Sequence, residues 1–239
     1  MSAAVGAGAG SRPRVRWGVP DAVWVWAGSL FAAAVVGSIV AAVRGRDASA
    51  TDAIDLVVAL AAQDGFVLVA IAWVARAKGL GSLRADFGLT LHLRDAPWLA
   101  VGVLLQVGAS GLVALLEAVG GGLEQQEAAR QLSRSDGPEV ILMVLGVVVV
   151  APLAEELLFR GLLLRALLRK TTAPAAVAIS AGIFAVVHLL DPNAAPFLVP
   201  LAIVGLVAGM LAVRSGELSQ PLMLHAGFNL LSAVLLLTD

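Results

Sequence analysis

Long apolar runs separated by short polar connections dominate the pattern of this chain. A membrane-spanning helix needs about 20 mostly apolar residues. The connections leave no room for a separate soluble domain, so the pattern predicts an all-α, polytopic integral membrane bundle of about seven transmembrane helices. The stretches that meet the length requirement are 22–43, 54–75, 97–119, 139–159, 173–190, 196–213 and 219–237.

The ends of the bundle follow from the same pattern. Residues 1–20, rich in glycine and alanine at their start, are expected to form a flexible cytoplasmic tail, and residues 21–239 a single transmembrane helical domain. The first apolar stretch has about 22 residues, whereas the apolar core of a signal peptide has about 7–15. We therefore expect it to be an uncleaved first span.

The amino-acid composition also indicates that most of the protein's surface faces lipid. Hydrophobic residues make up 59% of the chain and charged residues 14%, against roughly 25% charged residues in ordinary globular proteins. The absence of cysteine excludes disulfides, thiolate zinc sites and a cysteine nucleophile. A net charge of −1 does not indicate the positively charged surface that binds nucleic acid, so nucleic acid is not expected as a partner.

The charged connections indicate an orientation. If seven helices alternate, three basic segments lie on one side of the membrane, and lysine and arginine favour the cytoplasmic side. We therefore expect a multi-pass protein of the cell membrane with its amino terminus in the cytoplasm and its carboxyl terminus outside. The basic residues of these segments are Arg12, Arg14 and Arg16, then Arg76, Lys78, Arg84 and Arg94, then Arg160, Arg165, Arg169 and Lys170.

Ionisable side chains inside a span are costly and usually face a cavity or a partner. The fourth span ends on Glu155, Glu156 and Arg160. Glu156 and Arg160 are four residues apart, so they lie on one helical face and can pair. Glu155 points about 100° away from Glu156 and is left without a local partner, as a general base requires. The alternative is that both acids reach the membrane surface.

Two further motifs lie in later spans. His188 closes the sequence Phe184-Ala-Val-Val-His188 in the fifth span, and alone it could be a hydrogen-bonded core residue. His225 and Asn229 are four residues apart on the seventh span and so share a face. The small residue Gly227 between them permits close approach of another helix or a substrate. As an alternative, this pair could be a polar clamp between helices.

One glutamate, two histidines and an asparagine suit hydrolysis by activated water. Glu155 would take the proton, His188 would orient the water, and His225 and Asn229 would donate hydrogen bonds to the developing oxyanion. Alternatively, Glu155, His188 and His225 could hold zinc, since two imidazoles and a carboxylate form an accepted catalytic set. The residues leave open whether the cofactor is zinc or none.

Together the three motifs resemble the CAAX-processing and bacteriocin-processing (CPBP) intramembrane proteases, of which the type II CAAX prenyl endopeptidases are the best-known members. The resemblance covers roughly residues 139–232. It implies an intramembrane endopeptidase acting on a membrane protein or a lipidated peptide, with the bilayer as its environment. It also implies that Glu155, His188, His225 and Asn229 form the catalytic site and that Glu156 and Arg160 support it.

Two other functions remain open at this stage. A small proton- or ion-coupled transporter also carries acidic groups and histidines inside its spans, and Asp55, Asp64 and Glu117 would then gain importance. A non-catalytic membrane scaffold or immunity protein would use polar residues to bind helices together. For the protease, we assign no catalytic role to these three acids.

The depths of Glu155 and His188 do not agree if the fourth span ends near Arg160. At a rise of about 1.5 Å per residue, Glu155 would lie about 7 Å and His188 about 22 Å from the same membrane surface. A fourth helix that continues past Arg160, together with tilted helices or an inward dip of the stretch 191–200, would close the difference, and we therefore expect Glu155 to lie nearer to mid-membrane.

Overall fold

The computed structural model describes residues 15–45, 52–120, 130–131, 137 and 139–238. Within these residues the regular elements are all helices, some of them short 3₁₀ or π segments. In chain order they are α1 (Val19–Val43), α2 (Ala53–Lys78), α3 (Leu83–Phe87), η1 (Leu93–Asp95), α4 (Pro97–Gly120), α6 (Glu139–Leu145), η2 (Gly146–Val150), α7 (Ala151–Glu155), η3 (Glu156–Leu163), α8 (Leu164–Leu168), α9 (Ala173–Val187), η4 (His188–Leu190), η5 (Pro192–Phe197), α10 (Leu198–Ser215) and α11 (Ser219–Thr238).

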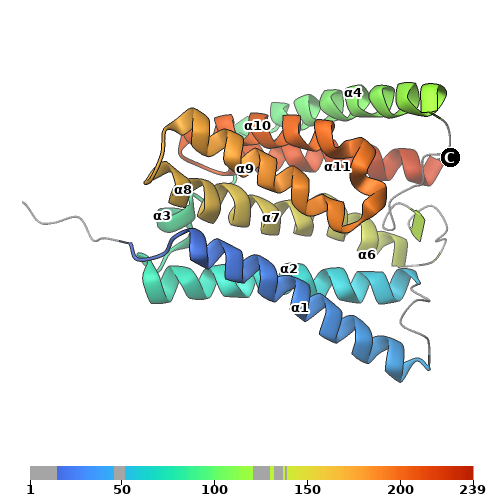
Figure 1. Ribbon diagram of the computed structural model, residues 1–239, viewed down its shortest axis with the longest axis horizontal. Coiled ribbons are helices and arrows are strands. Elements are labelled where there is room, and N and C mark those ends of the chain that lie inside the picture. Colours follow the sequence, from blue (N-terminus) through green and yellow to red (C-terminus); the bar gives the residue numbers. More distant parts are fainter. Residues whose placement is uncertain (1–14, 46–51, 121–129, 132–136, 138, 239) are drawn as a thin grey trace, which may run out of the picture.

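Seven helical runs in the described part of the chain are long and apolar enough to cross a membrane. Successive runs point in opposite directions, so α1 begins at one end of the bundle and α11 finishes at the other (Figure 1). Large apolar side chains such as Phe31, Leu104 and Val119 are 71%, 69% and 83% exposed on the outside. Because water would not tolerate so much apolar surface, the chain is a multi-pass membrane protein, and the predicted all-α seven-span class is confirmed.

The fourth span is longer than predicted. Its helical run continues from Glu139 to Leu168 instead of ending at residue 159. Arg160, taken from the sequence as part of a connection, is 1% exposed inside this run, because Glu156 neutralises its charge there. The expectation that the helix continues past Arg160 is confirmed, and Glu155 lies near the middle of the run.

Small residues let two pairs of spans approach closely. A Cβ added to Gly227 of α11 would collide with the backbone of Leu99 in α4, and one added to Gly102 of α4 would collide with the backbone at Leu224. Gly227 therefore does permit close approach of another helix, as predicted. In a second close pair, Gly205 of α10 lies against Ala181 of α9.

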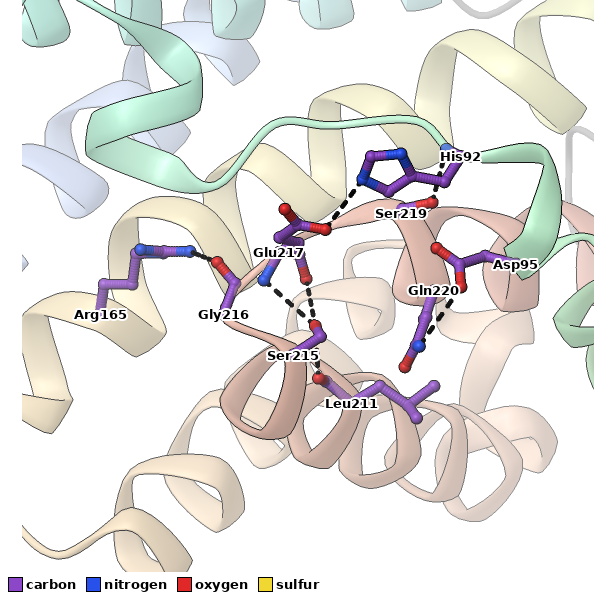
Figure 2. Close-up of polar contacts among 9 residues, drawn as sticks. All are labelled: His92, Asp95, Arg165, Leu211, Ser215, Gly216, Glu217, Ser219 and Gln220. Carbon is purple, nitrogen blue, oxygen red and sulfur yellow. Dashed lines mark hydrogen bonds and ion pairs between the residues drawn. The ribbon is translucent and has the colours of Figure 1, made fainter.

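A layer of polar contacts ties the start of α4 to the α10–α11 turn (Figure 2). The His92 backbone N–H donates to Ser219 Oγ over 2.9 Å, and the His92 ring lies 3.0 Å from Glu217 Oε2. Arg165 of α8 donates to the Gly216 carbonyl over 2.6 Å. These bonds link the third and fourth spans to the turn between the sixth and seventh spans, at the end of the bundle where α1 begins.

Part of the segment predicted to be a flexible tail is packed against the bundle. Residues 1–14 lie outside the described residues, but Trp17 is 5% exposed and its indole N–H donates to Asp86 over 3.0 Å. Its ring also contacts Phe87, with centroids 5.3 Å apart. Residues 15–18 thereby anchor the start of α1 to the connection after α2.

Candidate active site

Glu155 lies at a change of helical geometry in the fourth span. It is the last residue of α7, which has π-helical segments before it (η2) and after it (η3). Such segments widen a helix locally and are frequent at functional sites. The Glu155 side chain is 27% exposed, so it can reach water while remaining inside a membrane-spanning run.

Glu155 and His188 share a cavity of about 130 Å³. A single water needs only about 10–15 Å³ of such space, so several waters fit. The walls come from α1, α2, the fourth span and the end of the fifth: Trp26, Ser29, Leu30, Gln63, Asp64, Val67, Ala154, Glu155, Leu158, Phe159, Val187, His188 and Leu190. The fold thus brings together two of the predicted catalytic residues from separate spans.

His188 is oriented by its own helix. It follows the last residue of α9 and begins η4, and its Nδ1 lies 2.7 Å from the Phe184 carbonyl oxygen. Because a carbonyl only accepts, Nδ1 must carry the proton of this bond. Nε2 is then the ring nitrogen available for a hydrogen bond with water or substrate.

Behind Glu155 lies a buried charged cluster of Glu156, Arg160 and His225. Glu156 and Arg160 are 0% and 1% exposed, and Arg160 Nη1 donates to Glu156 Oε1 over 2.8 Å. The predicted pairing on one helical face is therefore confirmed. His225 Nδ1 lies 2.9 Å from the same carboxylate oxygen, and its Nε2 lies 3.6 Å from Glu155 Oε2. Glu156 thus fixes the imidazole that faces Glu155.

The ring of Phe184 packs against both histidines and Arg160. Its centroid lies 4.9 Å from that of His188 and 5.6 Å from that of His225. The guanidinium carbon of Arg160 lies 4.3 Å from the Phe184 centroid, within cation–π range. One fully buried aromatic ring therefore sets the spacing between the two imidazoles.

Asn229 replaces a missing backbone donor. The Ala151 N–H bonds to the Gly146 carbonyl in the π pattern. The next donor in that pattern would serve the Val147 carbonyl, but it is Pro152, which has no N–H. Asn229 Nδ2 donates to the Val147 oxygen over 2.8 Å instead. Neither Asn229 nor His225 lines the cavity that Glu155 and His188 share.

Sequence reasoning assigned Asp64 no catalytic role in the protease, yet this residue lines the cavity with Glu155 and His188. The signal available in the sequence was an acidic residue in the middle of an apolar run. The other two acids of the same group lie elsewhere. Asp55 pairs with Arg44 at the start of α2, and Glu117 is exposed near the end of α4.

The arrangement does not fit the zinc alternative. Among the described residues, no group of three histidine, aspartate or glutamate side chains is spaced to hold a metal ion. We therefore derive no catalytic step through a metal.

A second, larger hollow lies between α1 and α2, and its lining is almost entirely apolar. Its volume is about 480 Å³, and it is lined by Trp24, Phe66, Val69, Ala70, Trp73 and Lys78. The single ionisable group among these residues, Lys78, is paired with Asp21 over 2.6 Å. The smaller cavity at Glu155 is therefore the better candidate for catalysis.

Comparisons with known proteins agree with this location. The family model of type II CAAX prenyl endopeptidase Rce1-like proteins matches residues 137–231. An "uncharacterized 24.3 kDa protein" of Escherichia coli is 36% identical over 90 residues, which cover 37% of this chain and 41% of that relative. The match thus spans less than half of that curated protein. No solved structure matches the chain.

The matched segment contains all three motifs, from Glu155 to Asn229. It includes the whole of the fourth, fifth and sixth spans and most of the seventh, and it leaves α1, α2 and α4 outside. The match agrees with the resemblance predicted from the motifs: residues 137–231 are similar to the type II CAAX prenyl endopeptidase Rce1-like proteins.

Proposed function

We propose that this protein is an intramembrane endopeptidase that hydrolyses a peptide bond of a membrane-associated or prenylated protein, with Glu155 activating the attacking water. The observation that carries this proposal is that Glu155 and His188 line one cavity within the membrane-spanning bundle. The family match on residues 137–231 supports the same reaction class.

The reaction needs one base that changes protonation. Glu155 removes a proton from water as the water oxygen bonds to the scissile carbonyl carbon, and the carbonyl electron pair moves onto its oxygen. When this intermediate collapses, the carbon–nitrogen bond breaks. Glu155 then returns the proton to the leaving amine, so the base is regenerated.

The remaining groups position the reactants. His188 Nε2 is available to hydrogen-bond water or substrate because its Nδ1 is held by Phe184. His225 faces Glu155 with its Nε2 while Glu156, itself paired with Arg160, holds its Nδ1. One N–H of the Asn229 amide is used on Val147. Because Asn229 does not line the cavity, its part in the proposed site is to hold the fourth span in place behind Glu155.

The size of the cavity limits what enters it. Its volume of about 130 Å³ is well below the roughly 300–1,000 Å³ of ordinary ligand pockets. The cavity therefore accommodates the scissile amide and water, while the rest of the substrate contacts the surrounding helices. A flexible, locally unfolded segment of a membrane-bound protein meets this requirement better than a folded domain.

The Glu155→Gln variant tests the proposal. The purified proteins would be given an internally quenched peptide that carries a farnesylated cysteine, in the presence and absence of a chelator. We expect the variant to lose about 10²–10⁴-fold in cleavage rate, the range for loss of a general base, and we expect the chelator to leave the wild-type rate unchanged.

The matched control is Glu117→Gln, because Glu117 is exposed on α4 and away from the cavity. Equal cleavage by both variants would rule out Glu155 as the base. If chelation abolished cleavage and zinc restored it, the metal-free mechanism would be wrong. Altered ion flux in Glu155→Gln liposomes with no peptide product from either protein would favour the transporter, and impaired assembly of a partner complex would favour the scaffold.

A further inference from the structure

Asp64 is the acidic residue that the motifs do not explain. It lies on α2, outside the segment 137–231 that matches the family. Its side chain faces the same cavity as Glu155 and His188. A carboxyl group outside the motif helices therefore also lines this cavity.

The surroundings of Asp64 are unfavourable for a purely structural carboxylate. Asp64 is 7% exposed, and no hydrogen bond joins it to another described residue. By contrast, Asp55 on the same helix is paired with Arg44 and accepts at the start of α2. A buried carboxyl group without a partner lowers the stability of the folded state. Asp64 is therefore expected to destabilise the fold at this position.

Buried groups that cost stability and face a site are typical of function. The charged and titratable groups that line the cavity with Asp64 are Glu155 from the fourth span and His188 from the end of the fifth, while α1 contributes Trp26, Ser29 and Leu30. None of these supplies a cation to neutralise a carboxylate permanently. The cavity that both acidic side chains line has a volume of about 130 Å³, which is enough for several waters.

We propose that Asp64 is a further catalytic residue, which binds the reacting water together with Glu155. Water has two O–H bonds. If Glu155 accepts one and Asp64 accepts the other, the lone pair of the water oxygen is directed away from both carboxyl groups and toward the substrate carbonyl. Only the proton held by Glu155 is transferred, so Asp64 is unchanged over the cycle. This inference rests on the proposed endopeptidase function.

Two substitutions separate a catalytic from a structural role. Asp64→Asn keeps an oxygen that accepts from water, and Asp64→Leu removes it. For Asp64→Leu we expect kcat on the farnesylated peptide to fall about 100-fold, the size of effect that misplacing a reactant produces, with KM nearly unchanged. We expect Asp64→Asn to retain at least about a tenth of the wild-type kcat because the acceptor remains.

Thermal unfolding in detergent gives a second readout that needs no substrate. Because the buried carboxyl group is unfavourable, we expect Asp64→Leu to unfold at the same or a higher temperature than the wild type. A clearly lower unfolding temperature would mean that Asp64 supports the fold, and the proposal would be wrong. The control Asp55→Asn removes a paired carboxylate from the same helix and should lower stability while leaving kcat near the wild-type value.

Glu155→Gln in the same assay separates this inference from the proposed function. If Glu155→Gln is inactive and Asp64→Leu cleaves normally, Asp64 has no part in catalysis and the endopeptidase function stands. If Glu155→Gln cleaves normally, the proposed function itself is wrong. Equal losses in Asp64→Asn and Asp64→Leu would also contradict the role as a hydrogen-bond acceptor.

Discussion

The Glu156–Arg160 pair is the most completely buried ionic contact among the described residues. Desolvation of both ions opposes it, so it adds little net stability compared with apolar side chains. Removing one partner alone is strongly destabilising, because the other charge then stays buried and uncompensated. The Nε and Nη2 atoms of Arg160 already have no hydrogen-bond partner in the described structure, which makes the site sensitive to further loss.

We expect Arg160→Met to destabilise the protein by about 3–5 kcal/mol, the usual cost of breaking a buried pair. The double variant Glu156→Leu with Arg160→Met should recover most of that loss, since no charge is left unpaired. Unfolding of the three proteins in detergent, followed by circular dichroism against denaturant, measures the difference. Equal stability of the single and double variants would contradict the assigned coupling.

The residues of the site were predictable from sequence to the extent that local spacing encodes them. Glu156 and Arg160 are one helical turn apart, so their pairing followed from helical geometry alone. That Asp64 lines the same cavity as Glu155 was not predictable, because it depends on how α2 packs against the fourth span. Spacing along the chain carries no information on that contact.

At the scale of the element, Pro152 explains the irregular geometry of the fourth span. Proline cannot donate a backbone hydrogen bond, and the π segment η2 (Gly146–Val150) lies directly before it. The Val147 carbonyl, which lacks its backbone donor, receives Asn229 from α11. A seventh-span side chain thus completes the backbone hydrogen bonding of the helix that carries Glu155.

We expect Asn229→Ala to cost about 1–3 kcal/mol, the penalty for a buried carbonyl left without a donor. Pro152→Ala restores an N–H near Val147, so Asn229→Ala should cost less when it is made in that background. A double-mutant cycle of unfolding free energies measures the coupling. Additive effects of the two substitutions would mean that Asn229 does not replace the proline donor.

The boundary of the fourth span shows why element ends were harder to predict than elements. From the sequence alone, Arg160 predicts the end of a span, because an unpaired arginine is expected at the membrane surface. Inside the bundle, Glu156 and the Phe184 ring provide its surroundings. The helix therefore continues to Leu168, and only the tertiary contacts reveal it.

At the scale of the whole molecule, the two ends of the bundle differ in charge. Most described basic residues lie in the connections at the end where α1 begins (Figure 1): Arg16, Arg76, Lys78, Arg84, Arg94, Arg165, Arg169, Lys170 and Arg214. Among the described residues, Arg44 and Arg130 lie in the connections of the opposite end. Because basic connections stay in the cytoplasm, we propose that α1 begins in the cytoplasm and that α11 ends outside.

The absence of cysteine makes this orientation directly testable, since any introduced cysteine is the single thiol of the chain. Lys170→Cys lies in the exposed turn between α8 and α9, and Thr238→Cys at the end of α11. In intact bacterial cells, we expect a membrane-impermeant maleimide to label Thr238→Cys and to label Lys170→Cys only after permeabilisation. The reverse pattern would contradict the proposed orientation. Labelling of both before permeabilisation would contradict the three spans between these positions, because an odd number of spans places them on opposite sides of the membrane.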